Sequence, residues 1–116
     1  MSRSTLRIVI LLSALFTGLV HLVLLSIQIG DPSPIFILNG LGYLVLLALF
    51  WFNPSFLGGR RTLLHYAFMA YTALTILLWI QGGTRDLTGY LAKADEVILF
   101  VALWAHLRAE KVAGLA

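Results

Sequence analysis

The chain has 116 residues, of which 60% are hydrophobic and 11% charged, and its mean hydropathy is +0.96. An ordinary soluble domain is nearer half apolar and a quarter charged, so eight basic and five acidic side chains are too few to cover a water-facing surface. The net charge of +3 is not gathered into a basic stripe, which argues against a nucleic-acid partner. Cysteine is absent, which excludes disulfides, thiolate metal sites and c-type haem attachment. We therefore expect a protein whose main solvent is the lipid bilayer.

Four apolar segments have about the ~20 residues that a membrane-spanning helix needs. The first is too long for the ~7–15-residue apolar region of a secretory signal, and we interpret it as an uncleaved span. Proline- and glycine-containing breaks separate the segments, and their short lengths favour antiparallel neighbours. The sequence thus predicts an all-α, integral membrane four-helix bundle, up-down-up-down, forming one domain over residues 1–116. The predicted helices are residues 6–29, 35–52, 62–80 and 87–107.

The basic residues divide unevenly between the two ends of this bundle. Six lie at the end that holds both termini, and two lie toward the other end: Arg3, Arg7, Arg60, Arg61, Arg108 and Lys111 against Arg85 and Lys93. Since cytoplasmic ends of membrane proteins are enriched in Lys and Arg, the pattern predicts that both termini are cytoplasmic.

The first predicted helix carries a polar stripe. Successive helical residues turn by about 100°, so Ser13, Thr17, His21 and Gln28 fall within a sector of about 80°, with Gly18 beside them. Small and polar residues are what one membrane helix presents to another. We interpret the stripe as a packing face, and the alternative that it lines a solute path stays open.

The second and third helices carry polar residues at a similar level. Asn39 and Tyr43 lie near the outer end of the second helix, and Thr75 lies at a comparable depth in the third. Gly40 and Gly42 allow another backbone to approach closely, so packing is again the simplest interpretation.

The fourth helix contains ionisable residues at a depth where charges are costly and usually functional. Lys93 and Glu96 are three residues apart and can pair, while Asp95 points toward another side. At ~1.5 Å per residue, Glu96 and His21 lie ~13 Å and ~12 Å inside their helix ends. We therefore predict that Glu96 is buried against the first helix near His21. Two other interpretations remain: an interfacial helix that ends at Glu96, or a buried pair that only fixes helix register.

Three histidines are candidate cofactor ligands. His65 and His106 share one level near the cytoplasmic boundary, as a bis-histidine haem b requires, and His21 alone suffices for a chlorophyll. Histidines beside Arg61 and Arg108 more often reach for lipid headgroups. We therefore expect this level to carry no metal.

No nucleophile motif, phosphate loop, dinucleotide fingerprint or metalloprotease motif is present. The sequence favours a non-enzymatic membrane protein that acts by association, with other membrane subunits or with copies of itself. A small channel or carrier with an outer vestibule of His21, Asn39, Lys93, Asp95 and Glu96 is the alternative, followed by a haem- or chlorophyll-binding subunit.

Overall fold

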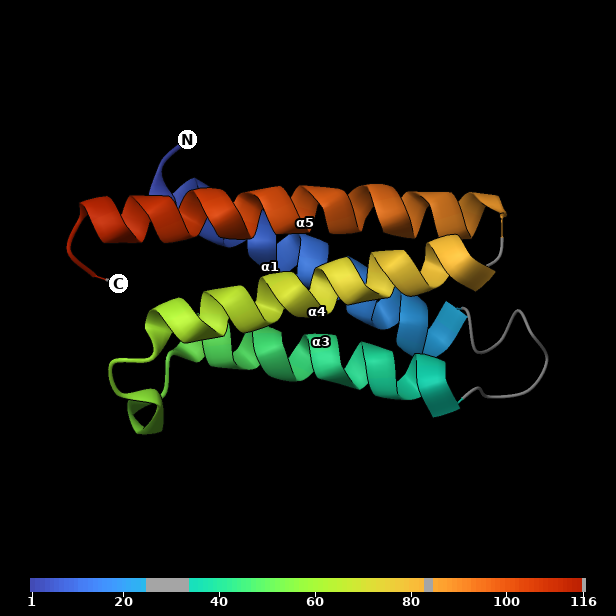
Figure 1. The fold of residues 1–116 in the computed structure, drawn as a ribbon, viewed down its shortest axis with the longest axis horizontal. Coiled ribbons are helices and arrows are strands. Elements are labelled where there is room, and N and C mark those ends of the chain that lie inside the picture. Colours follow the sequence, from blue (N-terminus) through green and yellow to red (C-terminus); the bar gives the residue numbers. More distant parts are fainter. Residues whose placement is uncertain (25–33, 83–84, 116) are drawn as a thin grey trace.

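The computed structural model describes residues 1–24, 34–82 and 85–115. These residues form helices and their connections and contain no strand, so the all-α class is confirmed for the described chain. Helix α1 continues directly into the π-helical turn η1, and the turn η2 is a 3₁₀ helix (Figure 1). The elements are α1 (Arg3–Leu19), η1 (Val20–Leu24), α3 (Pro34–Phe52), η2 (Ser55–Leu57), α4 (Arg61–Gly82) and α5 (Leu87–Val112).

The helices form a ring in which α1 packs between α3 and α5, and α4 closes the ring by contacting the same two helices. The colour order along the ribbons reverses from each helix to the next, and the N- and C-terminal ends lie at the same end of the bundle (Figure 1). The predicted adjacency of the first and fourth helices is therefore confirmed.

Three described helices are long and apolar enough to cross a membrane: Arg3–Val23, Pro34–Phe52 and Arg61–Gly82. This finding supports a membrane protein. Helix α5 is not among the three, and it carries Lys93, Asp95 and Glu96 in its first half and Glu110 with Lys111 near its end. The fourth span stays a prediction.

The predicted boundaries hold to within two residues for α3 and α4, but the predicted end of the last helix at residue 107 is wrong. Helix α5 continues to Val112, because Glu110 is paired with Arg61. Arg, Lys and Ala also favour the helical conformation whether or not the segment is apolar. Asp86 caps the start of α5 by accepting a hydrogen bond from the Gly89 amide at 2.8 Å. Residues 25–29 of the first predicted span lie outside the described residues.

The core is apolar and lies between two polar regions. Its fully buried side chains include Ile10, Tyr43, Phe68, Leu99 and Leu103. On α5, Leu99 and Leu103 separate Glu96 from the next buried polar residue, which is His106. Each polar region therefore occupies its own end of the bundle.

Candidate functional site

The first polar region is a cluster of Thr17, His21, Lys93 and Glu96, called here the Glu96 cluster. Glu96 is fully buried. Lys93 Nζ lies 2.9 Å from each carboxylate oxygen, and the Thr17 hydroxyl donates to Oε2 at 2.7 Å. The predicted Lys93–Glu96 pair and the predicted burial of Glu96 against the first helix are both confirmed. Such pairing is what makes a buried carboxylate tolerable.

His21 reaches this cluster through Thr17. Its Nδ1 atom lies 2.8 Å from the Thr17 carbonyl oxygen and 3.3 Å from the Thr17 hydroxyl. Because a carbonyl can only accept, Nδ1 carries the hydrogen in this contact. His21 and Glu96 are thus joined by the Thr17 side chain. Helix α5 also runs unbroken past Glu96, which contradicts an interfacial helix ending there.

Asn39, Thr75 and Tyr71 form a second hydrogen-bonded group. The side-chain amide of Asn39 donates to the Thr75 hydroxyl at 3.0 Å, and the Tyr71 hydroxyl donates to the backbone carbonyl oxygen of Asn39 at 2.7 Å. Tyr43 is fully buried, and its ring lies edge-on to Tyr71 with centroids 4.8 Å apart. The similar level predicted for Asn39 and Thr75 is confirmed by their contact.

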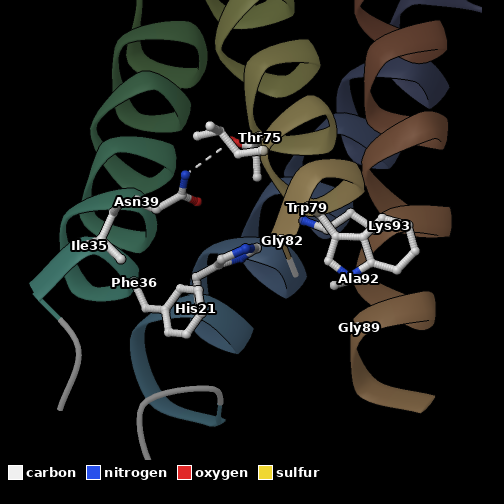
Figure 2. Close-up of a pocket in the computed structure, with 11 residues that line it drawn as sticks. His21, Ile35, Phe36, Asn39, Thr75, Trp79, Gly82, Gly89, Ala92 and Lys93 are labelled. Carbon is white, nitrogen blue, oxygen red and sulfur yellow. Dashed lines mark hydrogen bonds between the residues drawn. The ribbon is translucent and has the colours of Figure 1, made fainter. Parts of the chain in front are cut away.

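A cavity of about 330 Å³ lies between these groups. Its wall is formed by η1, which continues α1, and by α3, α4 and α5. Figure 2 shows the Asn39 amide and the His21 ring pointing into the space that Phe36 and Trp79 border. Its lining residues are His21, Ile35, Phe36, Asn39, Thr75, Leu78, Trp79, Gly82, Gly89, Ala92 and Lys93.

One polar atom at this cavity lacks a protein partner. Within the described chain, Asn39 Oδ1 is buried and accepts no hydrogen bond, although the nitrogen of the same amide is bonded to Thr75. A buried carbonyl without a donor is costly. A bound molecule with a hydroxyl or N–H group would satisfy it.

The predicted outer vestibule needs correction. His21, Asn39 and Lys93 line the cavity, but Asp95 and Glu96 are not among its described lining residues, because Glu96 turns toward Thr17. Asp95 is half-buried beside Ser13 of α1, and its Oδ2 atom has no hydrogen-bond partner among the described residues.

The predicted packing face is buried between helices. Ser13, Thr17 and Gly18 are buried on α1. A Cβ atom on Gly40 would lie 2.6 Å from the Gly18 carbonyl oxygen, and one on Gly42 would overlap the Tyr71 hydroxyl. Both glycines thus allow the close approach that was expected. Gln28 lies outside the described residues.

The second polar region is the Arg61 cluster, formed by Arg61, His65, His106 and Glu110. His65 Nε2 lies 2.9 Å from His106 Nδ1, which lies 3.3 Å from Glu110 Oε1. Arg61 contacts the same carboxylate at 3.1 Å through Nη2 and donates to the Phe50 carbonyl at 2.7 Å through Nη1. Both histidines are buried, so the expectation that they reach for lipid headgroups is wrong.

The two imidazole rings are stacked, with centroids 5.2 Å apart and an angle of 13° between their planes. A bis-histidine haem places its iron and porphyrin between the two rings. Because the rings bond each other directly, this arrangement does not leave room for the macrocycle.

Sequence reasoning missed Arg61 and Glu110 as parts of this cluster. The available signal was spacing: Arg61 precedes His65 by four residues, and Glu110 follows His106 by four. Residues four apart share a helix face. The rotation that turns both faces toward each other was not readable from spacing alone.

Comparison with known proteins finds no match, since no protein family, curated protein or solved structure corresponds to this chain. The function must therefore be argued from the two polar regions and the cavity.

Proposed function

We propose that this protein is a non-enzymatic, membrane-embedded binding protein whose cavity takes a small, mostly apolar molecule with one hydrogen-bond donor. The observation that carries this proposal is the cavity of about 330 Å³ between the helices, with Asn39 Oδ1 buried and unpartnered at its wall. Small-molecule sites are typically concave, of ~300–1,000 Å³, and apolar with a few converging polar groups.

The chemistry of the wall favours a neutral ligand. Phe36, Leu78 and Trp79 supply apolar surface. Lys93 is the one charged side chain among the described lining residues, and Glu96 holds its ammonium with both carboxylate oxygens. The pair carries no net charge, so the cavity offers hydrogen bonds and apolar contact instead of a site for a free ion.

The apolar core favours binding over conduction. Leu99 and Leu103 are fully buried between the Glu96 cluster and the Arg61 cluster. A channel or carrier, the function considered second from the sequence, would need this layer to open. Binding needs no such change.

Four membrane crossings, up-down-up-down with both termini cytoplasmic, are part of the proposal. Helix α5 supports a fourth crossing because its Lys93–Glu96 pair is buried and the large side chains that it exposes between Leu91 and Trp104 are apolar. These exposed residues include Leu91, Val97, Ile98, Val101 and Trp104.

Arginine–tryptophan contacts lie at both ends of the bundle, as interfacial anchoring requires. At the end with the termini, Arg7 stacks on Trp51 at 3.9 Å and Arg108 lies over Trp104 at 4.9 Å. At the other end, Arg85 stacks on Trp79 at 4.0 Å. These contacts suit two membrane interfaces, and the excess of basic residues at the first end supports a cytoplasmic location for that end.

Association with other subunits or with further copies, the function favoured by the sequence, stays a prediction. That association was inferred because one chain was not expected to supply hydrogen-bond partners for all of its polar side chains. In the described residues, Thr17, Lys93 and Glu96 satisfy one another within the same chain. These three polar groups therefore need no partner chain to satisfy them.

The cavity can be tested with tryptophan fluorescence, since Trp79 lines it. With Trp51→Phe and Trp104→Phe, Trp79 is the remaining emitter. The probe is 4-bromophenol, which has an apolar ring, a hydroxyl donor and a bromine that quenches tryptophan. For the protein in nanodiscs, we expect Trp79 quenching to saturate as the probe concentration rises, because a defined site fills. Quenching by probe that is only dissolved in the lipid would rise linearly instead.

Matched variants separate the cavity from the lipid-facing surface. Ala92 is fully buried in the cavity wall, so Ala92→Phe should remove the saturable component, whereas Ala94→Phe, on an exposed position, should keep it. The probe 4-bromoanisole lacks the donor for Asn39 and should bind about 5- to 30-fold more weakly, as one lost hydrogen bond of ~1–2 kcal/mol implies. Linear quenching in all variants would reject the binding site.

A further inference from the structure

We propose that His65, His106 and Glu110 form a binding site for a divalent transition-metal ion of the Zn²⁺ type at the end of the bundle that holds both termini. This site is separate from the cavity at the other end, and it departs from the expectation that the His65/His106 level carries no metal. The three residues are buried and come from α4 and α5.

The donor atoms are close enough to share one ion. One ligand atom from each of His65, His106 and Glu110 lies within 4.8 Å of the others. The histidine nitrogens are 2.9 Å apart, and His106 Nδ1 is 3.3 Å from Glu110 Oε1. Zinc bonds of ~2.0–2.1 Å in a tetrahedron place neighbouring ligands ~3.3 Å apart. His106 therefore lies within about half an ångström of the zinc spacing from both other ligands, and the His65 and Glu110 atoms, within 4.8 Å of each other, would approach on binding.

His65 is already oriented as a ligand. Its Nδ1 atom lies 2.8 Å from the Arg61 carbonyl oxygen, which can only accept, so Nδ1 carries the hydrogen. The lone pair of Nε2 then faces His106. Metal-bound histidines typically donate their other ring N–H to a carbonyl or carboxylate in this way. The Phe50 ring packs against both imidazoles in a T-shaped arrangement, with centroids 5.5 Å from His65 and 5.0 Å from His106, and holds them in place.

In the metal-free cluster, the hydrogen on His106 Nδ1 fills the gap between the donors. An ion bound at Nδ1 would displace this hydrogen, and the neutral ring would carry its single hydrogen on Nε2 instead. Binding would thus change the tautomer of His106, with one proton given to water and one taken from it, and would release no net proton.

Arg61 is the nearest group that opposes a cation, because its guanidinium already contacts both oxygens of Glu110, and Arg3 and Arg7 nearby add to the repulsion. A carboxylate has about four acceptor positions, so it can serve Arg61 and an ion together. Arg61 is also bonded to the Phe50 carbonyl. We therefore expect Arg61 to weaken binding without preventing it, and removing its charge should tighten binding.

An entry path exists. A second cavity of about 350 Å³ is lined by His106 and Glu110 together with Arg3, Arg7 and Arg61, among others. Water from this side can supply the fourth ligand that two histidines and one carboxylate leave open in a zinc site.

The test uses the full chain purified in detergent without a histidine tag, and Co²⁺ as a probe. We expect visible absorption bands of four-coordinate cobalt at one equivalent per chain, which Zn²⁺ removes. His65→Gln and Glu110→Gln should each weaken Co²⁺ binding at least about tenfold, the size of loss seen when metal sites lose supporting groups. His21→Gln, a buried histidine at the other end, is the matched control and should bind as the unaltered chain does.

The unaltered chain alone keeps the proposal falsifiable if a variant fails to fold. No saturable cobalt spectrum at one equivalent, or a spectrum of six-coordinate cobalt that Zn²⁺ does not displace, would overturn it. Binding that survives in His65→Gln would also overturn it. Arg61→Gln gives an independent signature, since binding through Glu110 predicts tighter Co²⁺ binding there, and weaker binding would contradict the geometry.

Discussion

The Thr17 hydroxyl connects a buried carboxylate to a neighbouring helix. It donates to Glu96 Oε2 at 2.7 Å, while Lys93 occupies both carboxylate oxygens from within α5. Hydrogen bonds to a buried charge contribute about 1.5–3 kcal/mol, more than most neutral pairs. Thr17 is thus a principal polar contact by which α1 recognises α5.

A double-mutant cycle tests this contact. Thr17→Val and Glu96→Met each remove one side of the bond, and we expect a coupling free energy above ~1 kcal/mol because the residues touch. The measurement is equilibrium unfolding in detergent. Thr72 provides the control, since its buried hydroxyl donates to the Phe68 carbonyl of its own helix. Thr72→Val with Glu96→Met should be additive within ~0.5 kcal/mol, and additivity for Thr17 as well would exclude the contact.

Spacing and depth were sufficient to predict that Lys93 pairs with Glu96 and that Glu96 faces the first helix. They did not identify Thr17 as the direct partner. A rise of ~1.5 Å per residue fixes the level of a side chain, but the choice between Thr17 and His21 depends on helix rotation. The π-helical turn Val20–Leu24 alters that rotation at His21, and its position has no clear signal in the residues.

The contact between the first two helices depends on two glycines. Gly18 and Gly40 face each other so closely that a Cβ on Gly40 would lie 2.6 Å from the Gly18 carbonyl oxygen and 2.8 Å from the Leu22 amide nitrogen. Both neighbours are backbone atoms, which cannot move aside as a flexible side chain would. Close approach of this kind is how helices gain packing energy in lipid.

Gly40→Ala should therefore destabilise the protein by about 1–3 kcal/mol, the usual cost of overpacking. Gly59→Ala is the control, because no atom lies within 4 Å of a Cβ at that position. Unfolding of both variants in detergent gives the comparison. Equal stability of the two variants would mean that the helices do not approach at Gly40.

Helix positions were more predictable than helix ends. Long apolar runs and the proline and glycine breaks determine where α3 and α4 lie, because each feature has a direct physical cause. The end of α5 was not predictable from hydropathy, since its last residues are held by the Arg61–Glu110 ion pair at 3.1 Å. That contact joins residues 49 positions apart, and no local pattern reports it.

The chain as a whole keeps its polar chemistry at two separate ends. The Glu96 cluster and the cavity lie at one end, the Arg61 cluster at the other, and the buried layer that includes Tyr43, Phe68 and Leu99 lies between them. If the bundle crosses a membrane, the cavity belongs to one side and the proposed metal site to the other. The direction of insertion therefore decides which compartment supplies each ligand.

Topology can be measured directly because the chain lacks cysteine, so one introduced cysteine is the sole thiol. Gly59→Cys lies between α3 and α4, Gly82→Cys ends α4, and Gly114→Cys follows α5. From the excess of Arg and Lys at the end with the termini, we expect a membrane-impermeant maleimide to label Gly82→Cys in intact cells. The other two positions should react only after the membrane is permeabilised.

Each pair of positions tests a different crossing. Gly59 and Gly82 bracket α4, so labelling of both from one side would contradict its span. Gly82 and Gly114 bracket α5, the least apolar of the helices. Labelling of both from one side would mean that α5 lies outside the membrane, so its Lys93–Glu96 pair would not be at membrane depth. Labelling of Gly59→Cys and Gly114→Cys in intact cells, with Gly82→Cys protected, would keep the α4 and α5 crossings but reverse the orientation. The cavity would then face the cytoplasm, because the basic residues would have failed to direct insertion.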